Sequence, residues 1–154
     1  MKNIIFAVAC ICLAVSAAYA QKITQDKVPA AAVSNFNKQF ASATKTLWEM
    51  DEADFEVNFK TNGVEYSAKY DKQGTWLETE QEIKLSELPA SVKKGLETEF
   101  PKAETEEVEK VSYPTGEAVY EMEIEKDKQK FEVQFSAEGK LLKKEEIHKK
   151  ENKD

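Results

Sequence analysis

Two stretches of this chain carry the same order of apolar, proline and glycine residues. The first covers residues 28–83 and the second covers residues 88–147. Pro29 recurs 60 positions later as Pro89, and an apolar stripe with helical spacing follows each proline. The stripes are Ala32, Phe36 and Phe40 in the first copy and Val92, Leu96 and Phe100 in the second. Residues four apart share one face of a helix, and proline suits the first helical turn because its missing N–H is not needed there. Each copy is therefore predicted to begin with a helix.

After each predicted helix the apolar period changes to two, which is the period of a half-buried strand. In the first copy the alternation runs through residues 55–59 and 64–70, with the hairpin dipeptide Asn62-Gly63 between them. The matching apolar residues lie 65 positions later and are Tyr120, Met122, Ile124, Phe131, Val133 and Phe135. The change of offset predicts a five-residue insertion in the loop that contains Tyr113. The predicted fold class is α+β: a tandem repeat of a helix plus about four antiparallel strands, with the helices packed on one face of the sheet.

The chain is expected to divide into a leader, two repeated units and a charged tail. The expected bounds are 1–20, 21–85, 86–148 and 149–154, and residues 21–27 are expected to be a polar spacer. Because each strand is apolar on one face only, the units are expected to join edge to edge into one curved sheet, which removes two exposed edges. The alternative is two units joined loosely after residue 85, although one unit alone is small for a stable domain.

The first twenty residues have the features of a secretory signal peptide. Lys2 precedes an apolar run over residues 4–15, and residues 18–20 form a small-x-small cleavage motif. The run is shorter than the roughly 20 residues that a membrane span needs. Cleavage is predicted between Ala20 and Gln21. Export to the periplasm is therefore expected, with an extracellular location as the alternative.

Cleavage would remove Cys10 and Cys12, which lie too early in the apolar run for a lipoprotein anchor. Lys2 would be the only charged residue lost, so the formal net charge would change from −7 to −8. This charge argues against nucleic acid and anionic membranes as partners. Every basic residue other than the single histidine is a lysine. The absence of arginine argues against an enzyme that clamps a phosphorylated substrate.

No residue group has the pattern of a catalytic or metal site. His148 has neither a second histidine nor a cysteine of the mature chain to act with, so it is expected at the solvated surface. Acidic runs such as residues 104–109 lack the glycine-pivoted spacing of a calcium loop. Glu78, Glu80 and Glu82 would share one face of a strand, which predicts a solvated or edge-protecting face. No catalytic residue, metal or cofactor is predicted.

Most aromatic residues are explained as core beneath the predicted helices, but three are not. Trp48 is flanked by charged residues, Trp76 shares a predicted strand face with glutamates, and Tyr113 lies in the inserted loop. An exposed Trp or Tyr on an open sheet is typical of an interface anchor. Trp48, Trp76 and Tyr113 are therefore the candidate binding residues, and packing into the core is the alternative for each.

The motifs of the second copy resemble those of a known family. They are Leu-Pro-Ala-x-Val and Phe-Pro-x-Ala within residues 88–103, Tyr-Glu-Met-Glu-Ile at 120–124, Phe-Glu-Val-Gln-Phe at 131–135 and Glu-Gly-Lys at 138–140. The first copy has Phe40-Ala41 in place of Phe-Pro. Residues 28–147 resemble the PepSY-like, beta-lactamase-inhibitor-like family of small exported proteins from Bacteroides-type bacteria. The resemblance implies tandem helix-on-sheet units. In the inhibitor for which the family is named, the concave face of such a sheet grips an enzyme.

The leading hypothesis is a non-enzymatic periplasmic binding module that contacts a protein or peptide through its open sheet face and the Tyr113 loop. One version of this hypothesis is an inhibitor-like protein. The alternative is a carrier of a small ligand or cation in an acidic groove between the two units. A third hypothesis, an acid–base hydrolase, requires two carboxyl groups facing each other in a cleft with one pKa raised. Neither a nucleic-acid partner nor a membrane span is expected, and the sequence specifies no oligomeric state.

Overall fold

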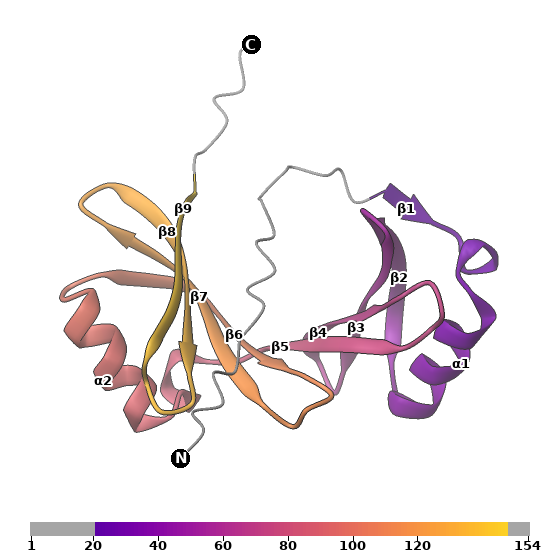
Figure 1. The fold of residues 1–154 in the computed structure, drawn as a ribbon, viewed down its shortest axis with the longest axis horizontal. Helices are drawn as coiled ribbons and strands as arrows, with labels where there is room; N and C mark the ends of the chain where they lie inside the picture. Colours follow the sequence, from indigo (N-terminus) through magenta and orange to yellow (C-terminus); the bar gives the residue numbers. More distant parts are fainter. Residues whose placement is uncertain (1–20, 148–154) are drawn as a thin grey trace, which may run out of the picture.

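A computed structural model of the chain describes residues 21–147. Within this range the chain forms two α-helices and one nine-stranded antiparallel sheet, whose strands neighbour one another in chain order (Figure 1). The strands are β1 (Gln21–Ile23), β2 (Thr44–Asp51), β3 (Asp54–Thr61), β4 (Val64–Tyr70), β5 (Trp76–Glu82), β6 (Glu104–Ser112), β7 (Ala118–Lys126), β8 (Gln129–Ser136) and β9 (Leu141–Ile147). The helices are α1 (Ala30–Gln39) and α2 (Ala90–Glu99), preceded by the short 3-10 helices η1 (Gln25–Lys27) and η2 (Leu85–Glu87). The α+β class and the continuous sheet are confirmed. The predicted leader, His148 and the tail lie outside the described residues.

Each α-helix begins directly after its proline and ends one residue before a phenylalanine. Pro29 precedes α1, and at the other end the N–H of Phe40 donates to the carbonyl oxygen of Phe36 at 2.8 Å. The equivalent bond closes α2, where the N–H of Phe100 donates to the carbonyl oxygen of Leu96 at 2.8 Å. The first helix therefore ends at Gln39. Phe40 leaves the helical conformation, and its ring packs on the core.

The two helices cover separate cores on the same side of the sheet. The buried residues beneath α1 are Val28, Ala32, Phe36, Trp48, Val57, Phe59, Ala68 and Tyr70. Those beneath α2 are Leu88, Val92, Phe100, Val108, Tyr120, Met122, Ile124, Phe131, Val133 and Phe135. In each half the strand residues on this side alternate with polar residues, as the period of two predicts.

A glycine turn holds the start of each helix against the sheet. Gly74 and Gly139 precede the last strand of their halves, with φ of 82° and 83°. A side chain at Gly74 would collide with Ala31 and Ala32 of α1, and one at Gly139 would collide with the backbone of Ser91 in α2. Glycine is therefore required at both turns for conformation and for close approach.

The segment before α1 is ordered, which corrects the expected spacer over residues 21–27. β1 extends the sheet by pairing with β2, and Ile23 lies opposite Trp48. Ile23 also packs against the first core. A strand of three residues has too little alternation to be recognised from its sequence. Its conformation is stabilised by pairing with the edge of β2.

The two halves meet where β5 pairs with β6. The paired positions are Thr79 with Ser112, Glu80 with Val111, Gln81 with Lys110 and Glu82 with Glu109. This register keeps both helices on one side of the sheet and leaves the opposite side without a covering helix among the described residues. In Figure 1 the helices lie at the two outer ends and the strands lie between them.

The loop between β6 and β7 holds three of the five extra residues of the second half, and β6 and β7 are each one residue longer than β2 and β3. The loop spans residues 113–117, whereas the equivalent turn between β2 and β3 spans residues 52–53. The Tyr113 N–H donates to the carbonyl oxygen of Glu117 at 3.1 Å, and the Gly116 N–H donates to that of Tyr113 at 3.0 Å. The insertion therefore forms a compact turn at the junction of the halves.

Candidate functional site: the uncovered face of the sheet

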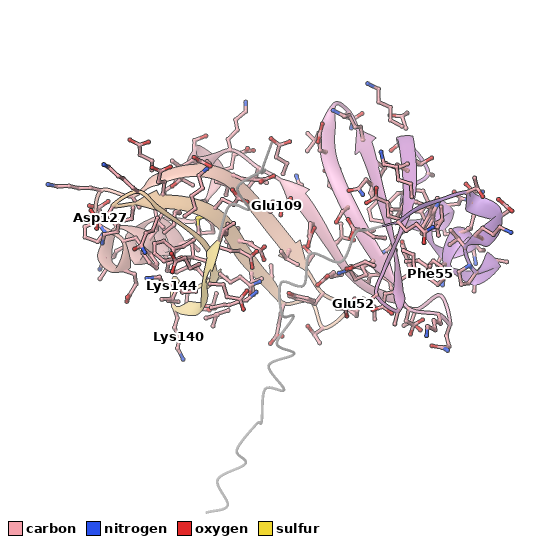
Figure 2. The ribbon with its side chains drawn as sticks, turned by 90° about the horizontal axis from the view of Figure 1, so that it is seen from above. Glu52, Phe55, Glu109, Asp127, Lys140 and Lys144 are labelled. Carbon is pink, nitrogen blue, oxygen red and sulfur yellow. The ribbon has the colours of Figure 1, made fainter. Side chains whose placement is uncertain are left out.

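The side of the sheet away from the helices is lined mainly by carboxylates. Strand alternation and the pairing registers place the following residues there: Glu49, Asp51, Asp54, Glu56, Glu65, Glu78, Glu80, Glu82, Glu107, Glu109, Glu121, Glu123, Glu125, Glu132 and Glu145. We call this set the acidic face. Lys60, Lys69, Lys130 and Lys143 are lysines interspersed among these residues. Figure 2 shows Glu109 near the middle of the molecule, between the two halves.

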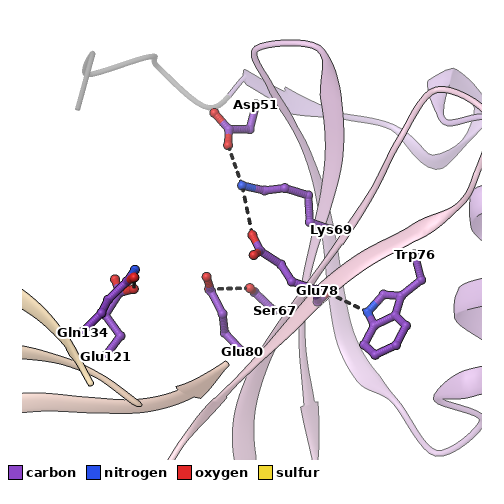
Figure 3. Close-up of polar contacts among 8 residues, drawn as sticks. All are labelled: Asp51, Ser67, Lys69, Trp76, Glu78, Glu80, Glu121 and Gln134. Carbon is purple, nitrogen blue, oxygen red and sulfur yellow. Dashed lines mark hydrogen bonds and ion pairs between the residues drawn. The ribbon is translucent and has the colours of Figure 1, made fainter. Parts of the chain in front are cut away.

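The lysines compensate part of this charge. Lys69 Nζ lies 3.0 Å from Asp51 Oδ2 and 3.5 Å from Glu78 Oε1 (Figure 3). Burial acts to lower the pKa of Lys69, but the hydrogen bond to Asp51 and the nearby carboxylates raise it well above its usual range. Lys143 Nζ lies 2.9 Å from Glu132 Oε1 and 3.2 Å from Glu145 Oε2. Lys69 is therefore a permanent cation within the first half of the acidic face.

The centre of the acidic face has carboxyl groups directly opposite one another. Glu82 lies across from Glu109 on β6, and Glu109 lies across from Glu121 on β7. Burial, with the charge of Glu80 next, raises the pKa of Glu109 to about 8. Burial and the charge of Glu132 raise the pKa of Glu121 to about 7, although Gln134 Nε2 donates a hydrogen bond to Glu121 Oε2 at 2.6 Å. Like charges opposite each other are unfavourable, so these two groups hold protons near neutral pH.

A hollow of about 310 Å³ lies on this face between the halves. It is lined by Lys45, Leu47, Glu56, Asn58, Phe59, Lys60, Glu65, Tyr66, Ser67, Glu80, Glu107 and Glu109. Glu80 is one of the lining residues, and Ser67 Oγ donates a hydrogen bond to Glu80 Oε2 at 2.7 Å (Figure 3). Strands β2 to β6 all contribute to the hollow, so it exists only because the two halves form one sheet.

The three candidate aromatic residues are not brought together. Trp48 is 3% exposed and packs edge-on against Phe36 with ring centroids 5.6 Å apart. Trp76 is half-buried against the first core, and its Nε1 donates to the Glu78 carbonyl oxygen at 2.7 Å and to Thr79 Oγ1 at 2.9 Å. The expectation of exposed tryptophan anchors is therefore wrong for Trp48, and Trp76 lies on the helix side of the sheet.

Tyr113 differs from the tryptophans because it lies beside the acidic face. Burial, followed by the charges of Glu78, Glu121 and Glu80, raises the pKa of the Tyr113 phenol to about 12. These carboxylates come from β5 and β7, so the inserted loop places its ring at the junction of the halves. Among the three candidates, Tyr113 has the position that a binding residue on the acidic face would need.

The glutamates of β5 share one strand face, as expected, and Glu82 is exposed there. The edge-protecting role is contradicted. β5 pairs on both sides and is an interior strand. Burial raises the pKa of Glu78, and the charge of Lys69 lowers it in part. The alternation of strand residues between the two sheet faces could have predicted this arrangement. The glutamates on β5, β6 and β7 all alternate with helix-side residues, so they share the opposite face of one sheet.

No metal site or membrane helix is found in the described part of the chain. Residues 21–147 hold no group of three or more His, Cys, Asp or Glu side chains arranged to bind a metal ion. No helix in that range is long and apolar enough to cross a membrane. The carboxylates of the acidic face are therefore spread along strands rather than gathered around one point.

This is an α+β protein in which two helices cover one face of a single antiparallel sheet. No helix within residues 21–147 covers the other face. The chain belongs to the family described as “Putative beta-lactamase-inhibitor-like, PepSY-like”, whose model matches residues 14–68 and again residues 53–143. No curated protein matches the chain.

Several solved structures share the fold. One, described with “putative periplasmic proteins” from Bacteroides eggerthii, has a TM-score of 0.73 and 21% identity, covering 78% of this chain and 89% of that one. A DUF2874 family protein from Bacteroides uniformis has a TM-score of 0.73 and 20% identity, covering 77% and 89%. A BLIP-like protein from Bacteroides fragilis has a TM-score of 0.69 and 21% identity, covering 82% and 92%. At these identities the likeness concerns the fold alone.

Proposed function

We propose that this chain is a non-enzymatic, periplasmic binding module that contacts a protein or peptide through the acidic face. The observation that carries the proposal is a sheet face that no helix within residues 21–147 covers and on which carboxylates greatly outnumber lysines. Charge of one sign on a surface selects a partner of the opposite sign and speeds its association. The preferred partner surface is therefore rich in lysine or arginine. The family membership and the periplasmic description of one structural relative support an exported location.

Tyr113 is the proposed aromatic contact within this surface. Its ring stands between carboxylates of both halves, in a loop that the first copy lacks. Tyrosine contributes a large contact area with few rotatable bonds, and an aromatic face also attracts lysine and arginine cations. Trp48 and Trp76 support the fold of the first half and contribute to binding only through it.

The experiment that tests the proposal places a photo-cross-linking amino acid at Tyr113 and, as a matched control, at Asn37 on the exposed side of α1. Both variants are exposed to a periplasmic extract, and cross-linked proteins are identified by mass spectrometry. We expect a basic protein captured at position 113 and absent at position 37. Equal capture at both positions would contradict the acidic face as the binding surface.

The alternative carrier function would use the hollow of about 310 Å³ between the halves. A thermal-shift screen against divalent cations and small metabolites separates the two functions. A ligand at about 100 times its dissociation constant stabilises its protein by about 2.7 kcal/mol. A stabilising ligand whose effect disappears in Glu80→Gln would favour the carrier over the protein-binding module.

The hydrolase hypothesis can also be stated in terms of particular residues. Glu109 and Glu121 are opposite each other and both have a raised pKa, with values of about 8 and about 7. They are neighbours on adjacent strands, rather than groups on the two walls of a cleft, and a hydrolase needs one carboxyl ionised while the other is protonated. Hydrolysis that is lost in Glu109→Gln would revive this hypothesis. We expect none.

A further inference from the structure

The two halves of the molecule have separate cores. All of the buried residues beneath α1 come from residues 28–70, and all of those beneath α2 come from residues 88–135. The partly buried Ile83, directly after β5, packs against the second core. Apolar packing therefore fixes the shape of each half but not the angle between them.

The connection across the sheet is also short. β5 and β6 are paired at the four positions from Thr79 to Glu82, whereas β6 and β7 are paired at eight. Side chains on the helix side of this connection are polar, with Gln81 opposite Lys110 and Thr79 opposite Ser112. On the acidic face the apolar Val111, opposite Glu80, is buried, and Thr79 is buried on the helix side. The ladder therefore joins the halves with only these two buried side chains at its paired positions.

Carboxyl groups from the two halves face one another across the acidic face. Around Glu109 stand Glu56 on β3, Glu80 and Glu82 on β5, Glu107 on its own strand and Glu121 on β7. Around Glu121 stand Glu80 on β5, Glu109 on β6, Glu132 and Gln134 on β8, and Lys143 on β9. The cations near these groups are Lys69, beside Glu56 and Glu78, and Lys143, bound to Glu132 and Glu145. Lys45 and Lys60 line the hollow together with Glu109, and the Tyr113 phenol lies near Glu80 and Glu121. Carboxyl groups thus dominate on both sides of the β5–β6 connection.

We propose that the β5–β6 connection is a hinge about which the two halves of the sheet open and close as the central carboxyl groups of the acidic face lose and gain protons. In the closed form these groups are partly buried and near like charges, which favours their neutral state. The open form gives them more water and greater separation, which favours the ionised state. By linkage, the form that binds protons more strongly is favoured at low pH. The halves therefore close in acid and open as the pH rises through the range where Glu121 and Glu109 ionise.

Distance measurements across the sheet test this hinge directly. Cysteines for spin labels replace Lys22 on β1 and Leu142 on β9, which are exposed residues at the two edges of the sheet, in the full chain with Cys10→Ser and Cys12→Ser. Opening a curved sheet lengthens the distance between its edges. We expect double electron–electron resonance to give a longer mean distance at pH 9 than at pH 5.5. The change should occur above the pH range in which ordinary carboxyl groups ionise, because burial raises the pKa of both Glu121 and Glu109 in the closed form.

Charge-neutral variants distinguish the hinge from a general effect of pH. Glu109→Gln with Glu121→Gln should abolish the change in distance, and each single variant should reduce it. Glu97→Gln with Glu99→Gln removes the same charge from α2 and should leave the change intact. A distance that is the same at both pH values would overturn the proposal. So would a change that persists in the Glu109→Gln, Glu121→Gln variant. The measurement involves no partner, so its outcome is independent of the binding function proposed above.

Discussion

The two halves of the sheet carry different charges at equivalent positions of the acidic face. In the first half Lys69 stands on the middle strand of a cross-strand row, between Glu56 and Glu78. The residues 65 positions later form the row Glu121, Gln134 and Lys143. The middle position thus holds a cation in one half and a neutral amide in the other, while the second lysine lies on the edge strand.

This exchange changes the protonation of the glutamates on each side. The pKa of Glu56 is raised by burial and by Glu80, but Lys69 lowers it in part. Glu121, the equivalent residue, has a hydrogen bond from Gln134 in place of a neighbouring ammonium group, and its pKa reaches about 7. The two halves therefore have equivalent core positions but differ in the distribution of charge on the acidic face.

The largest expected effect concerns the glycine turns that both halves have before their last strand. Gly139→Ala should destabilise the protein by about 3 kcal/mol or more, because φ is positive there and an added methyl group meets the Ser91 backbone. Gly74→Ala should cost a similar amount through its collision with α1. Chemical denaturation measures both changes.

Gly116→Ala and Gly63→Ala are the matched controls for these turns. Both positions have positive φ, but a Cβ there meets no atom within 4 Å. They should cost about 1 kcal/mol each, from the backbone conformation alone. Equal losses at Gly74 and Gly63 would contradict the close helix–turn packing.

The next effect tests how the halves differ. Lys69→Met should destabilise the protein by about 2 kcal/mol at pH 8, because the side chain is 17% exposed and its loss leaves Asp51, Glu56 and Glu78 without their cation. Gln134→Lys should instead stabilise by about 1 kcal/mol, since it places an ammonium group beside Glu121. If both variants lowered the free energy of unfolding by the same amount, the position of the lysine would have no influence on the stability of this face.

A smaller effect concerns the pH dependence of stability. The pKa of Glu109 is raised to about 8 in the folded protein from 4.5, so the folded state binds the proton more strongly than the unfolded chain does. Its stabilising contribution is therefore present below about pH 4.5 and is lost as the pH rises to about 8. Allowing for solvent screening, Glu109→Gln should remove about 1–2 kcal/mol of this decline. Urea denaturation from pH 5 to pH 9 measures it, and a slope unchanged by the variant would refute the raised pKa.

The smallest effect concerns Tyr113 and stability. Tyr113→Phe should change the free energy of unfolding by less than about 0.5 kcal/mol, because the residue lies in a surface loop outside both cores. Trp48→Ala should cost about 3 kcal/mol or more, as a buried core aromatic. Comparable losses would place Tyr113 in a structural role rather than at the binding surface.

The apolar pattern of the sequence predicted most of the fold. The helix stripes, the Asn62-Gly63 turn and the site of the insertion are all local signals, and each matches the structure. β1 could not be predicted, because the edge of β2 provides its order. The burial of Trp48 was predicted only as the alternative to exposure, since its charged neighbours in sequence point to the opposite face from its own ring.

The acidic face could be predicted only in part. The glutamates alternate visibly with apolar residues, so their common strand face follows from the sequence. Their raised pKa values depend on the pairing of β5 with β6, which brings Glu109 beside Glu82 and near Glu80. Such contacts between distant segments carry no local signal.

The affinity for a cationic peptide tests the central claim most directly. The probe is an extended peptide in which lysine and serine alternate, and its dissociation constant is measured by isothermal titration at low salt. Glu80→Lys with Glu107→Lys reverses two charges of the acidic face, and Glu97→Lys with Glu99→Lys makes the same change in net charge on α2. The account predicts at least about a tenfold loss of affinity for the first variant, equivalent to about 1.4 kcal/mol, and a much smaller loss for the second. Equal losses in the two variants would contradict it, because binding would then follow net charge and not the acidic face.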